Sequence, residues 1–405
     1  MNQRKCVWAK FAALLLAGSI WASAGPALAQ TVIKIGVVDS YTGFLAGAGD
    51  EMDKGISLYV KTHQKDLPPG VTVELLKRDD TSAPDVGKRL AQELITRDQV
   101  NFIAGVVGSP IAAAIASVAG EAKTPFVITN AAGAGITRIS PYVVRYSFTL
   151  WQQAYPLGQW TVKQGWKKGY TAVSDFIPGH DAEAAFTKGF TEGGGQVVNA
   201  ITFPTSQQDF ATIVQQIKDA KPDVAFIWVP AGPAATAVMK SVRDLKLREA
   251  GIKIVSTEDL VPDEELPNMG VTPVGLVTAG IYSAAASRPA NKAFVAAWTK
   301  EYGPTSSPDF VSADSWVGMD AIYQVIKQTG GKFDGDQALA ILKAYNNPNT
   351  PKGPVSIDPD TRDVIQNVYM RRTEMVNGKL ANVEFDVIPN VKDPWKEMNP
   401  PKPPQ

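Results

Sequence analysis

Residues 106–120, VVGSPIAAAIASVAG, place one serine, Ser109, between a buried apolar run and a helix of small apolar residues. No histidine or aspartate stands near Ser109 in the sequence to activate it as a nucleophile. The start of a helix offers free backbone N–H groups and the positive end of the helix dipole, which together bind anions. We therefore predict that Ser109 helps to hold an anionic ligand. The alternative is a plain N-cap in front of Pro110.

Other patterns that carry catalytic or metal chemistry are absent from the sequence. It has no C-x-x-C, H-E-x-x-H, G-x-S-x-G or Walker-type G-x-x-x-x-G-K pattern. Its two histidines, His63 and His180, do not cluster, so neither thiols nor grouped imidazoles are available to bind a metal. We predict no catalytic residue, no metal and no cofactor. A pair of carboxylates among the 40 acidic residues leaves a hydrolase open, although nothing singles one pair out.

Loops of small residues follow the predicted strands, at the carboxyl ends where parallel α/β sheets bind ligands. Three of them lie in the first part of the chain: DSYTGFLAGAGD, GVVGSPI and TNAAGAGITR. Three more lie in the second part: SDFIPGHDAE, VPAGPAA and STEDLVPDE. Two sheets that each present such loops predict a binding cleft between two lobes.

The elements that position these loops alternate between strand and helix. The first array predicts strands at 32–38, 71–80, 100–107 and 125–129, with helices at 49–64, 84–97 and 109–122. The second array predicts helices at 152–165, 180–192, 208–220 and 233–247, with strands at 170–175, 193–203, 223–229 and 252–257. This alternation predicts two parallel sheets with helices on both faces.

The last third of the chain is less regular. It predicts a strand at 275–283 and helices near 290–302, 312–329 and 336–345. Asn377-Gly378 stands between two alternating strands, which is a strong signal for a β-hairpin. The end of the chain is rich in proline, and we expect it to be extended or disordered.

The N-terminus determines the expected compartment. Three basic residues precede an apolar segment that is too short to span a bilayer, and ALA at 27–29 matches the small-x-small rule of signal peptidase. We predict a secretory signal at 1–29, with a membrane anchor as the alternative, and a soluble periplasmic product. The only cysteine, Cys6, lies within this signal, so the mature chain would have neither a disulfide nor a thiol.

Length and charge limit the class of protein further. The chain has 405 residues, of which 44% are hydrophobic, and this favours two or more domains. Without the signal it has 37 basic and 40 acidic residues, a net charge of −3. No basic patch stands out, so we predict no nucleic-acid partner.

The ordered segments resemble the periplasmic binding proteins of ABC transporters, specifically the leucine/isoleucine/valine-binding type with the type I fold. The segments that carry this resemblance are IKIGVVDSYTGFLAGAGDEMDKGISLYV, GVVGSPIAAAIASVA, PFVITNAAG, GHDAEAAFTKGF, QDFATIVQQIKDAKPDVAFIWVPAG and NKAFVAAWTKEYG. They follow one another over about residues 31–390. The resemblance implies an α/β fold of two Rossmann-like lobes with parallel sheets, three interlobe crossovers and a ligand cleft between the lobes.

The resemblance also implies where the lobes begin and end. The crossovers would lie near 148–152, 278–284 and 355–364. The parts of the chain would be lobe 1 at 31–149 plus 283–357, lobe 2 at 150–280 plus 360–392, and a Pro-rich tail at 393–405.

The family implies the residues that hold a ligand carboxylate. In its amino-acid binders a serine at the position of Ser109 contacts the carboxylate. The backbone at the positions of Ala131, Ala132 and Gly133 completes that contact. This agrees with the anion site predicted above from the helix start alone.

The family also implies the residues that hold the rest of the ligand. The ammonium partner is a glutamate that matches Glu258, with the adjacent Asp259 as a rival and a solvated loop carboxylate as the alternative. His180 falls in a lobe 2 loop that would face the cleft, and its alternative is the protein surface. Ala231 belongs to another of these loops.

The pocket departs from the leucine-binding pattern. Tyrosines of the family are replaced by Ala48 and, in a less certain alignment, by Gly179, so the pocket should differ in width or shape. Tyr41, Phe44 and Trp228 are candidates to refill it, with core packing as the alternative for Trp228. We therefore expect a ligand other than leucine alone, and the remaining residues suit a carboxylate with a larger apolar or aromatic body.

The function implied is that of an extracytoplasmic solute-binding protein, expected to be a monomer. It would capture a small carboxylate, either an amino acid or an aromatic carboxylic acid, by hinge closure and deliver it to an ABC permease in the inner membrane. A ligand sensor of the same fold that signals to a membrane receptor is one alternative. A secreted hydrolase is the other, and the missing nucleophile–base motif disfavours it.

Overall fold

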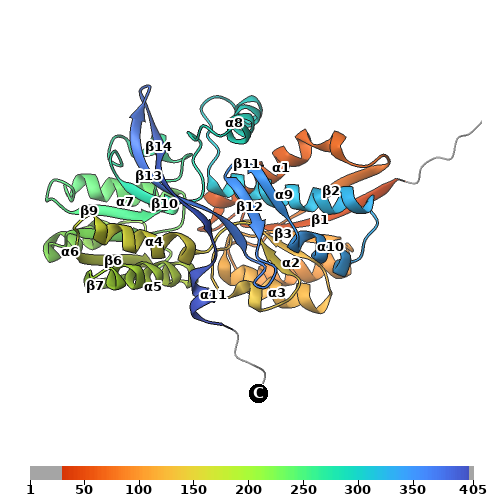
Figure 1. Cartoon of the computed structure of the whole chain (residues 1–405), viewed down its shortest axis with the longest axis horizontal. Coiled ribbons are helices and arrows are strands. Elements are labelled where there is room, and N and C mark those ends of the chain that lie inside the picture. Colours follow the sequence, from red (N-terminus) through yellow and green to blue (C-terminus); the bar gives the residue numbers. More distant parts are fainter. Residues whose placement is uncertain (1–29, 401–405) are drawn as a thin grey trace, which may run out of the picture.

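The computed structural model describes residues 30–400, so the predicted signal at 1–29 lies outside the described residues. Figure 1 shows two α/β units side by side, one formed by the N-terminal strands and the other by the middle of the chain. Within residues 30–400, no helix is both long and apolar enough to cross a membrane.

The first sheet has five parallel strands in the order β2-β1-β3-β4-β5. The sequences FIAG and FVI form strands β3 and β4 and are buried along their whole length, as expected where both faces of a parallel sheet are covered. The strands are β1 (Thr31–Asp39), β2 (Val71–Asp79), β3 (Phe102–Gly105), β4 (Phe126–Ile128) and β5 (Val143–Arg145). The helices between them are α1 (Ala46–Thr62), α2 (Pro84–Thr96) and α3 (Ser109–Glu121).

The second sheet has a parallel half and an antiparallel half. Strands β10, β9, β8, β6 and β7 run parallel in that order, and β13 joins β10 antiparallel. The parallel strands are β6 (Lys168–Ser174), β7 (Gln196–Phe203), β8 (Val224–Trp228), β9 (Lys253–Thr257) and β10 (Val277–Gly280). The helices of this unit are α4 (Leu150–Lys163), α5 (Ile177–Glu192), α6 (Ala211–Ala220) and α7 (Pro233–Asp244).

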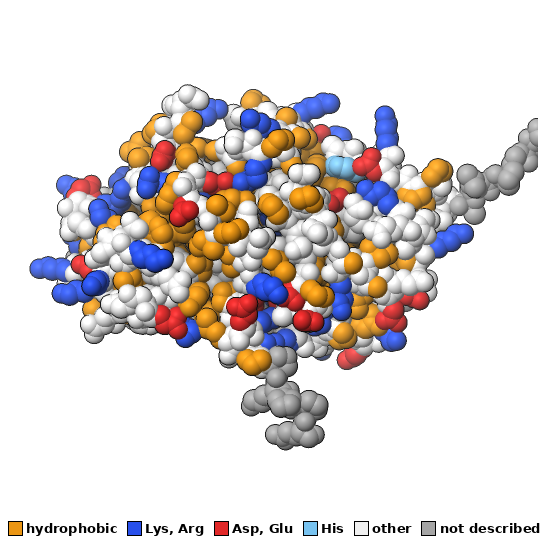
Figure 2. Space-filling view, viewed as in Figure 1, with side chains coloured by type: hydrophobic (Ala, Val, Ile, Leu, Met, Phe, Trp, Pro, Cys, Tyr) orange, Lys and Arg blue, Asp and Glu red, His pale blue; other side chains and the backbone are white. Residues whose placement is uncertain are grey.

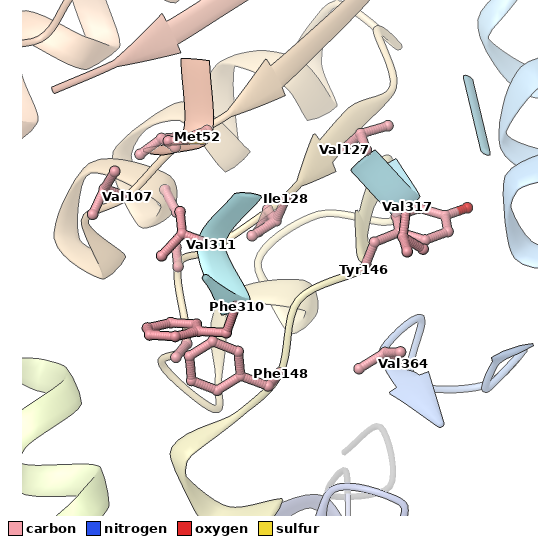
Figure 3. Packing of buried hydrophobic residues seen from close by; sticks show 14 of the residues in the cluster. Met52, Val107, Val127, Ile128, Tyr146, Phe148, Phe310, Val311, Val317 and Val364 are labelled. Carbon is pink, nitrogen blue, oxygen red and sulfur yellow. The ribbon is translucent and has the colours of Figure 1, made fainter. Parts of the chain in front are cut away.

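After β10 the chain returns to the first sheet. Helix α9 packs on β4 and on α1 so closely that a Cβ at Gly318 would lie 2.6 Å from Cγ2 of Thr129, and a Cβ at Gly55 would lie 2.5 Å from the carbonyl oxygen of Ser312. Figure 3 shows Val317 of this helix beside Val127 of β4. The returning helices are α8 (Pro289–Tyr302), α9 (Phe310–Thr329) and α10 (Gly335–Lys343).

The last strands add an antiparallel extension to the second sheet. The hairpin predicted at Asn377-Gly378 is confirmed: both residues have positive φ, 50° and 80°, and they join two long strands. The strands of the extension are β11 (Asn346–Thr350), β12 (Gly353–Ile357), β13 (Val364–Val376) and β14 (Lys379–Val391). Strands β11 and β12 fall within the range expected for lobe 1, yet they join the second sheet through β13.

The expectation of an extended tail from residue 393 is wrong for its first part. Residues 394–398 form a short helix, α11 (Pro394–Met398). Asp393 caps it by accepting the N–H of Trp395 at 3.0 Å, and Pro394 occupies the first turn, where a missing N–H costs nothing. The buried ammonium of Lys396 contacts the carboxylate of Asp363, which directly precedes β13, and this contact holds α11 against that part of the chain.

The core lies between each sheet and its helices, and the surface is mixed in charge. Figure 3 shows part of the larger core, with Met52 from α1, Ile128 from β4 and Tyr146 beyond β5. Figure 2 shows acidic and basic side chains interspersed over one face of the molecule, which agrees with the balanced charge of the sequence.

A candidate ligand cleft between the two sheets

A small hollow of about 30 Å³, partly open to solvent, lies between the carboxyl edges of the two parallel sheets. Both units contribute to it, since its walls include the segments after β3, β4 and β5 and the segments after β6, β8 and β9. This is the edge where parallel α/β sheets bind ligands. The residues that line it are Leu45, Ala48, Val107, Asn130, Ala132, Phe148, Leu150, Phe176, Pro178, Trp228, Pro230, Ala231, Asp259, Phe310 and Val311.

Four aromatic rings dominate this lining. Phe148 and Phe310 meet edge to face with their ring centroids 5.6 Å apart, and Figure 3 shows the two rings next to each other. Phe176 and Trp228 meet at the same separation with a tilt of 44°. Offset and edge-on contacts of this kind leave flat apolar faces on which a further ring can stack.

The two units touch at the rim of the hollow. Phe44, before α1, meets Phe176, before α5, edge to face with centroids 5.9 Å apart. The carboxylate of Asp181 on α5 accepts the N–H of Ala134 at 2.9 Å. The structure therefore has the cleft closed around the hollow, with both apolar and polar contacts across it.

Ser109 lies directly behind the loop that forms one wall. It is fully buried, and its Oγ accepts the N–H of Gly133 at 2.9 Å. It is the first residue of α3 and not its N-cap, because Gly108 occupies that position and makes no side-chain cap bond. The N-terminus of α3 is thus left without a side-chain cap, which leaves its first N–H groups to other partners.

The loop itself is held from behind by a buried cation. Arg145 donates to the carbonyl of Gly133 at 2.7 Å and to that of Phe148 at 3.2 Å, and its Nε lies 3.2 Å from Asp363. Burial lowers the pKa of Arg145 to about 10, so the guanidinium is still protonated at neutral pH. A fixed positive charge behind the loop favours an anion in front of it.

Two residues of the loop, Asn130 and Ala132, line the hollow and offer it polar groups. Ala131 is fully buried and its N–H is taken by the carbonyl of Val106 at 3.0 Å, whereas Ala132 lines the hollow. Asn130 also lines it: its Nδ2 makes a long bond of 3.3 Å to Val107, and its Oδ1 is buried without a hydrogen-bond partner in the described chain. A side chain left unsatisfied in this way signals a missing partner.

Asp259 supplies the opposite wall from the second sheet. Its Oδ2 accepts the hydroxyl of Thr257 at 2.6 Å and the indole N–H of Trp228 at 3.3 Å. Burial raises the pKa of Asp259 to about 6, against the lowering effect of these two donors. The carboxylate is therefore ionised at neutral pH and close to its titration range.

Glu258, the predicted ammonium partner, faces away from the hollow. Its carboxylate accepts the amide of Gln153 at 2.7 Å and the N–H of Ile281 at 3.0 Å, and it lies 3.5 Å from Arg371. Glu258 is fully buried and packs on Gly280, where an added Cβ would lie 2.4 Å from its carboxylate oxygen. Of the two adjacent acids, Asp259 is the one that lines the hollow.

Three other predicted site residues lie outside the hollow. Tyr41 donates its hydroxyl to Asp53 at 2.8 Å. His180 is half exposed and pairs with Asp175 at 2.9 Å. Gly179 is buried in the first turn of α5, and a Cβ there would lie 1.9 Å from the carbonyl oxygen of Ser174, so close packing explains this glycine. Ala231, by contrast, lines the hollow, and its contact with a ligand stays a prediction.

Sequence reasoning missed most of the aromatic wall. Asn130 and Phe176 stand in loops that were selected as ligand loops, but their side chains were not singled out. Phe148 and Phe310 come from a crossing segment and from the start of α9, and no local signal links them to the cleft. The aromatic bulk of the hollow comes from these rings and Trp228, whereas Phe44 stays at the rim.

Comparison with known proteins agrees with this geometry. Residues 32–379 match the family model described as periplasmic binding protein. Leu/Ile/Val-binding protein homolog 6 of Brucella melitensis biotype 1 is 36% identical over 382 residues, which cover 94% of this chain and 97% of that protein.

Two solved structures are similar over most of their length. A solute-binding protein of an ABC transporter from Rhodopseudomonas palustris BisB5, in complex with 3,4-dihydroxybenzoic acid, is 43% identical with a TM-score of 0.87, covering 90% of this chain and 99% of that one. A solute-binding protein of an ABC transporter from R. palustris, in complex with 4-hydroxybenzoate, is 40% identical with a TM-score of 0.86 and the same coverage.

Proposed function

This chain belongs to the periplasmic binding protein family, which consists of solute-binding proteins of ABC transporters and not of enzymes, and we propose that its ligand is an aromatic carboxylic acid of the hydroxybenzoate kind. The observation that carries the proposal is the lining of the hollow. Four aromatic rings line it. The polar loop of residues 130–133, beside the uncapped start of α3, lies on one side, and the carboxylate of Asp259 lies on the other.

The ligand carboxylate binds at the loop of residues 130–133. Ser109 uses its oxygen to accept the Gly133 N–H, which leaves its own proton for the ligand. The second hydrogen of the Asn130 Nδ2 group and the backbone N–H of Ala132 supply further donors, and the start of α3 adds positive potential from behind. Each hydrogen bond to a charged group contributes about 1.5–3 kcal/mol.

The ring of the ligand lies between the aromatic side chains, and its hydroxyl reaches Asp259. Thr257 and Trp228 both donate to Oδ2 of Asp259, which leaves Oδ1 for the phenol. An ionised carboxylate accepts a hydroxyl more strongly than a neutral group does. A 4-hydroxyl opposite the carboxylate matches a site with donors on one wall and an acceptor on the other. The two R. palustris proteins, which are in complex with 3,4-dihydroxybenzoic acid and 4-hydroxybenzoate, support this class of ligand.

An amino acid is the second candidate, and Asp259 is the observation in its favour. A carboxylate on the wall opposite the loop suits an ammonium as well as a phenol, and the Brucella relative is named as a Leu/Ile/Val-binding protein homolog. The four rings distinguish the candidates, because a branched aliphatic side chain uses flat aromatic faces less well than a ring does.

The two units act as lobes that close on the ligand. We assign the first sheet with α8, α9 and α10 to lobe 1, the second sheet to lobe 2, and the crossings at 148–152, 278–284 and 355–364 to the hinge. The ligand binds one open lobe, and contacts such as Asp181 to Ala134 form only on closure. The closed form then docks on a permease at the outer face of the inner membrane, after removal of residues 1–29.

A thermal-shift screen tests the ligand class. The protein without residues 1–29 is unfolded, dialysed to remove any ligand carried through purification, and refolded. It is then heated with benzoate, 4-hydroxybenzoate, 3,4-dihydroxybenzoate, leucine, isoleucine or valine. A ligand at 100 times its dissociation constant stabilises the fold by about 2.7 kcal/mol. A shift with the hydroxybenzoates supports the proposal. A shift with the amino acids alone would contradict it, because Asp259 would then bind the ammonium group of an amino acid.

A further inference from the structure

Three carboxylic acids meet at a second contact between the two units, beside the hollow, because Asp309 directly precedes Phe310, which lines it. Glu264 follows β9 of the second sheet, in the segment that leads to β10. Glu51 lies on α1 and Asp309 caps α9, and both helices pack on the first sheet. The acids therefore come from opposite sides of the contact, and their proximity depends on how the two units are placed.

Glu264 and Asp309 lie within hydrogen-bonding reach of each other. Oδ1 of Asp309 is used as the helix cap, since it accepts the N–H of Val311 at 2.8 Å and that of Ser312 at 3.1 Å. Its Oδ2 and Oε2 of Glu264 are buried, and neither has a hydrogen-bond partner in the described chain. Two ionised carboxylates side by side would repel, whereas one proton between them satisfies both oxygens.

The surroundings place that proton on Glu264. Two backbone N–H groups stabilise the ionised form of Asp309, whereas a single backbone N–H, that of Glu264 itself, stabilises the ionised form of Glu264. Glu51 adds a third carboxyl group that is 2% exposed, and its Oε2 also has no partner in the described chain.

Few positive charges offset these acids. Lys54 lies 3.4 Å from Glu51 but is shared with Asp50. Arg371 is directed at Glu258 and Asp263, at 3.5 and 3.8 Å. The titratable and charged groups that face the three acids are Asp50, Lys54, Asp263, Tyr282, Tyr302 and Asp314. Within residues 30–400, no three His, Cys, Asp or Glu side chains are arranged to hold a metal ion.

We propose that Glu264 is a proton-binding site of the closed protein, which takes up one proton when the lobes close and donates it to Oδ2 of Asp309. The proposal rests on the closing of the lobes assigned above, but not on the identity of the ligand. Closure is then coupled to a proton, so ligand affinity depends on pH even for a ligand that does not titrate.

The sign of this dependence follows from the contact. Burial, together with the charges of Asp309 and Glu51, raises the pKa of Glu264 well above its ordinary value. In the open protein Glu264 is solvated and has the ordinary value, about 4.3. The closed form therefore binds more protons. Affinity is highest below the open-state pKa, falls by up to tenfold per pH unit above it, and levels off above the closed-state pKa.

Calorimetry of 4-hydroxybenzoate binding in buffers with different heats of ionisation measures the proton taken up. Three proteins are compared near pH 6: wild type, Glu264→Gln, and Glu265→Gln as the matched control. Glu265 is the next residue and accepts Thr236 at 2.7 Å and Asn268 at 3.0 Å within its own unit. The glutamine at 264 can donate its amide to Asp309 without titrating, so closure is retained.

We expect wild type and Glu265→Gln to take up nearly one proton more per ligand than Glu264→Gln does. Equal proton uptake in all three proteins would overturn the proposal. If 4-hydroxybenzoate gives no heat, the proposed ligand fails instead, and the same three proteins are titrated with leucine, the second candidate ligand. Wild type and Glu265→Gln should again take up more proton than Glu264→Gln does, and equal uptake would overturn the proton site. So would stabilisation by Ca²⁺ that Glu264→Gln abolishes, since the acids would then bind a cation.

Discussion

A substitution at Ser109 should separate an effect on ligand affinity from an effect on the stability of the fold. Ser109→Ala removes the hydroxyl that we assign to the ligand carboxylate, so affinity for 4-hydroxybenzoate should fall by about 1.5–3 kcal/mol, or roughly 10- to 150-fold. The fold loses only the bond from Gly133, which is worth about 1 kcal/mol. Calorimetry and urea denaturation measure the two effects.

Ser140 provides the matched control for this change. It is also buried, and its Oγ accepts the N–H of Tyr142 at 3.1 Å, but unlike Ser109 it makes no bond to the loop of residues 130–133. Ser140→Ala should cost similar stability and leave affinity unchanged. If the two variants bind 4-hydroxybenzoate equally well, Ser109 has no place in the site.

Asp259 should set the preference for a hydroxylated ring. In the wild type the ionised carboxylate accepts the phenol, so 4-hydroxybenzoate should bind about 10-fold or more tightly than benzoate. Asp259→Asn should reduce this ratio to a few-fold and change benzoate binding little. The pKa of Asp259 is raised to about 6, so the ratio should also fall as pH drops through 6 and the carboxylate becomes neutral.

The ratio of the two affinities isolates Asp259 from Glu264. Protonation of Glu264 strengthens closure on either ligand, and its effect cancels when one affinity is divided by the other. Titrations with benzoate and 4-hydroxybenzoate from pH 5 to 8 give the ratio directly. A ratio that stays constant over this range, or that survives Asp259→Asn, would remove Asp259 from the hydroxyl.

At this scale the sequence predicts chemistry better than geometry. The sequence does not show which of the adjacent acids Glu258 and Asp259 faces the ligand. The short helical turn that follows β9 directs Glu258 into the protein interior and Asp259 into the hollow. Phe148 and Phe310 are distant in sequence and become neighbours only through the return of α9 to the first sheet. Ser109 stays a prediction, made because it combines a strand end with a helix start.

The short helix α11 is the element whose stability is simplest to test. Asp393 accepts the N–H of Trp395 and the hydroxyl of Thr149, at 3.0 and 3.2 Å. Asp393→Ala should lower the free energy of unfolding by about 2 kcal/mol through the lost cap and the lost buried bond. Asp393→Asn keeps an oxygen that accepts both donors and should cost clearly less.

Urea denaturation of both variants tests this account of the C-terminus. Burial raises the pKa of Asp393 to about 6, so the comparison is made below pH 6, where the protonated carboxyl group is neutral like the amide. Equal losses for Asp393→Ala and Asp393→Asn would mean that the charge matters and not the cap.

Elements that belong to the strand–helix alternation could be predicted, even the three-residue strand β4, whereas short elements outside that alternation could not. The alternation that predicted α2 and β8 spans many residues of the same pattern, and Asn377-Gly378 predicts its hairpin from turn chemistry alone. Strand β5 has three residues and α11 has five, so neither has a period to detect. The tail composition also hid the Asp393-Pro394 start of α11, although that pair is a recognised helix signal.

Closure of the whole molecule should depend on the contact between Asp181 and Ala134. This is a hydrogen bond across the cleft, made by a carboxylate of the second unit to the ligand loop of the first. Asp181→Ala should speed ligand release about tenfold and change association little, because the bond forms after the ligand has bound. Stopped-flow fluorescence follows release, with Trp228 in the cleft as a reporter.

Asp175→Ala is the control for this experiment. Asp175 is exposed and pairs only with His180 at the surface, two residues before the same helix. It should release the ligand at the wild-type rate. Release from Asp181→Ala at that same rate would show that this contact does not hold the lobes closed.

One titration tests the central claim most directly, namely that the hollow between the two sheets receives an aromatic carboxylate. The protein without residues 1–29, refolded free of ligand, is titrated calorimetrically with 4-hydroxybenzoate and separately with leucine. We expect one 4-hydroxybenzoate per chain, with affinity weakened by Ser109→Ala, and no heat from leucine. Binding of leucine in the absence of any response to 4-hydroxybenzoate would contradict the account and make this an amino-acid binder.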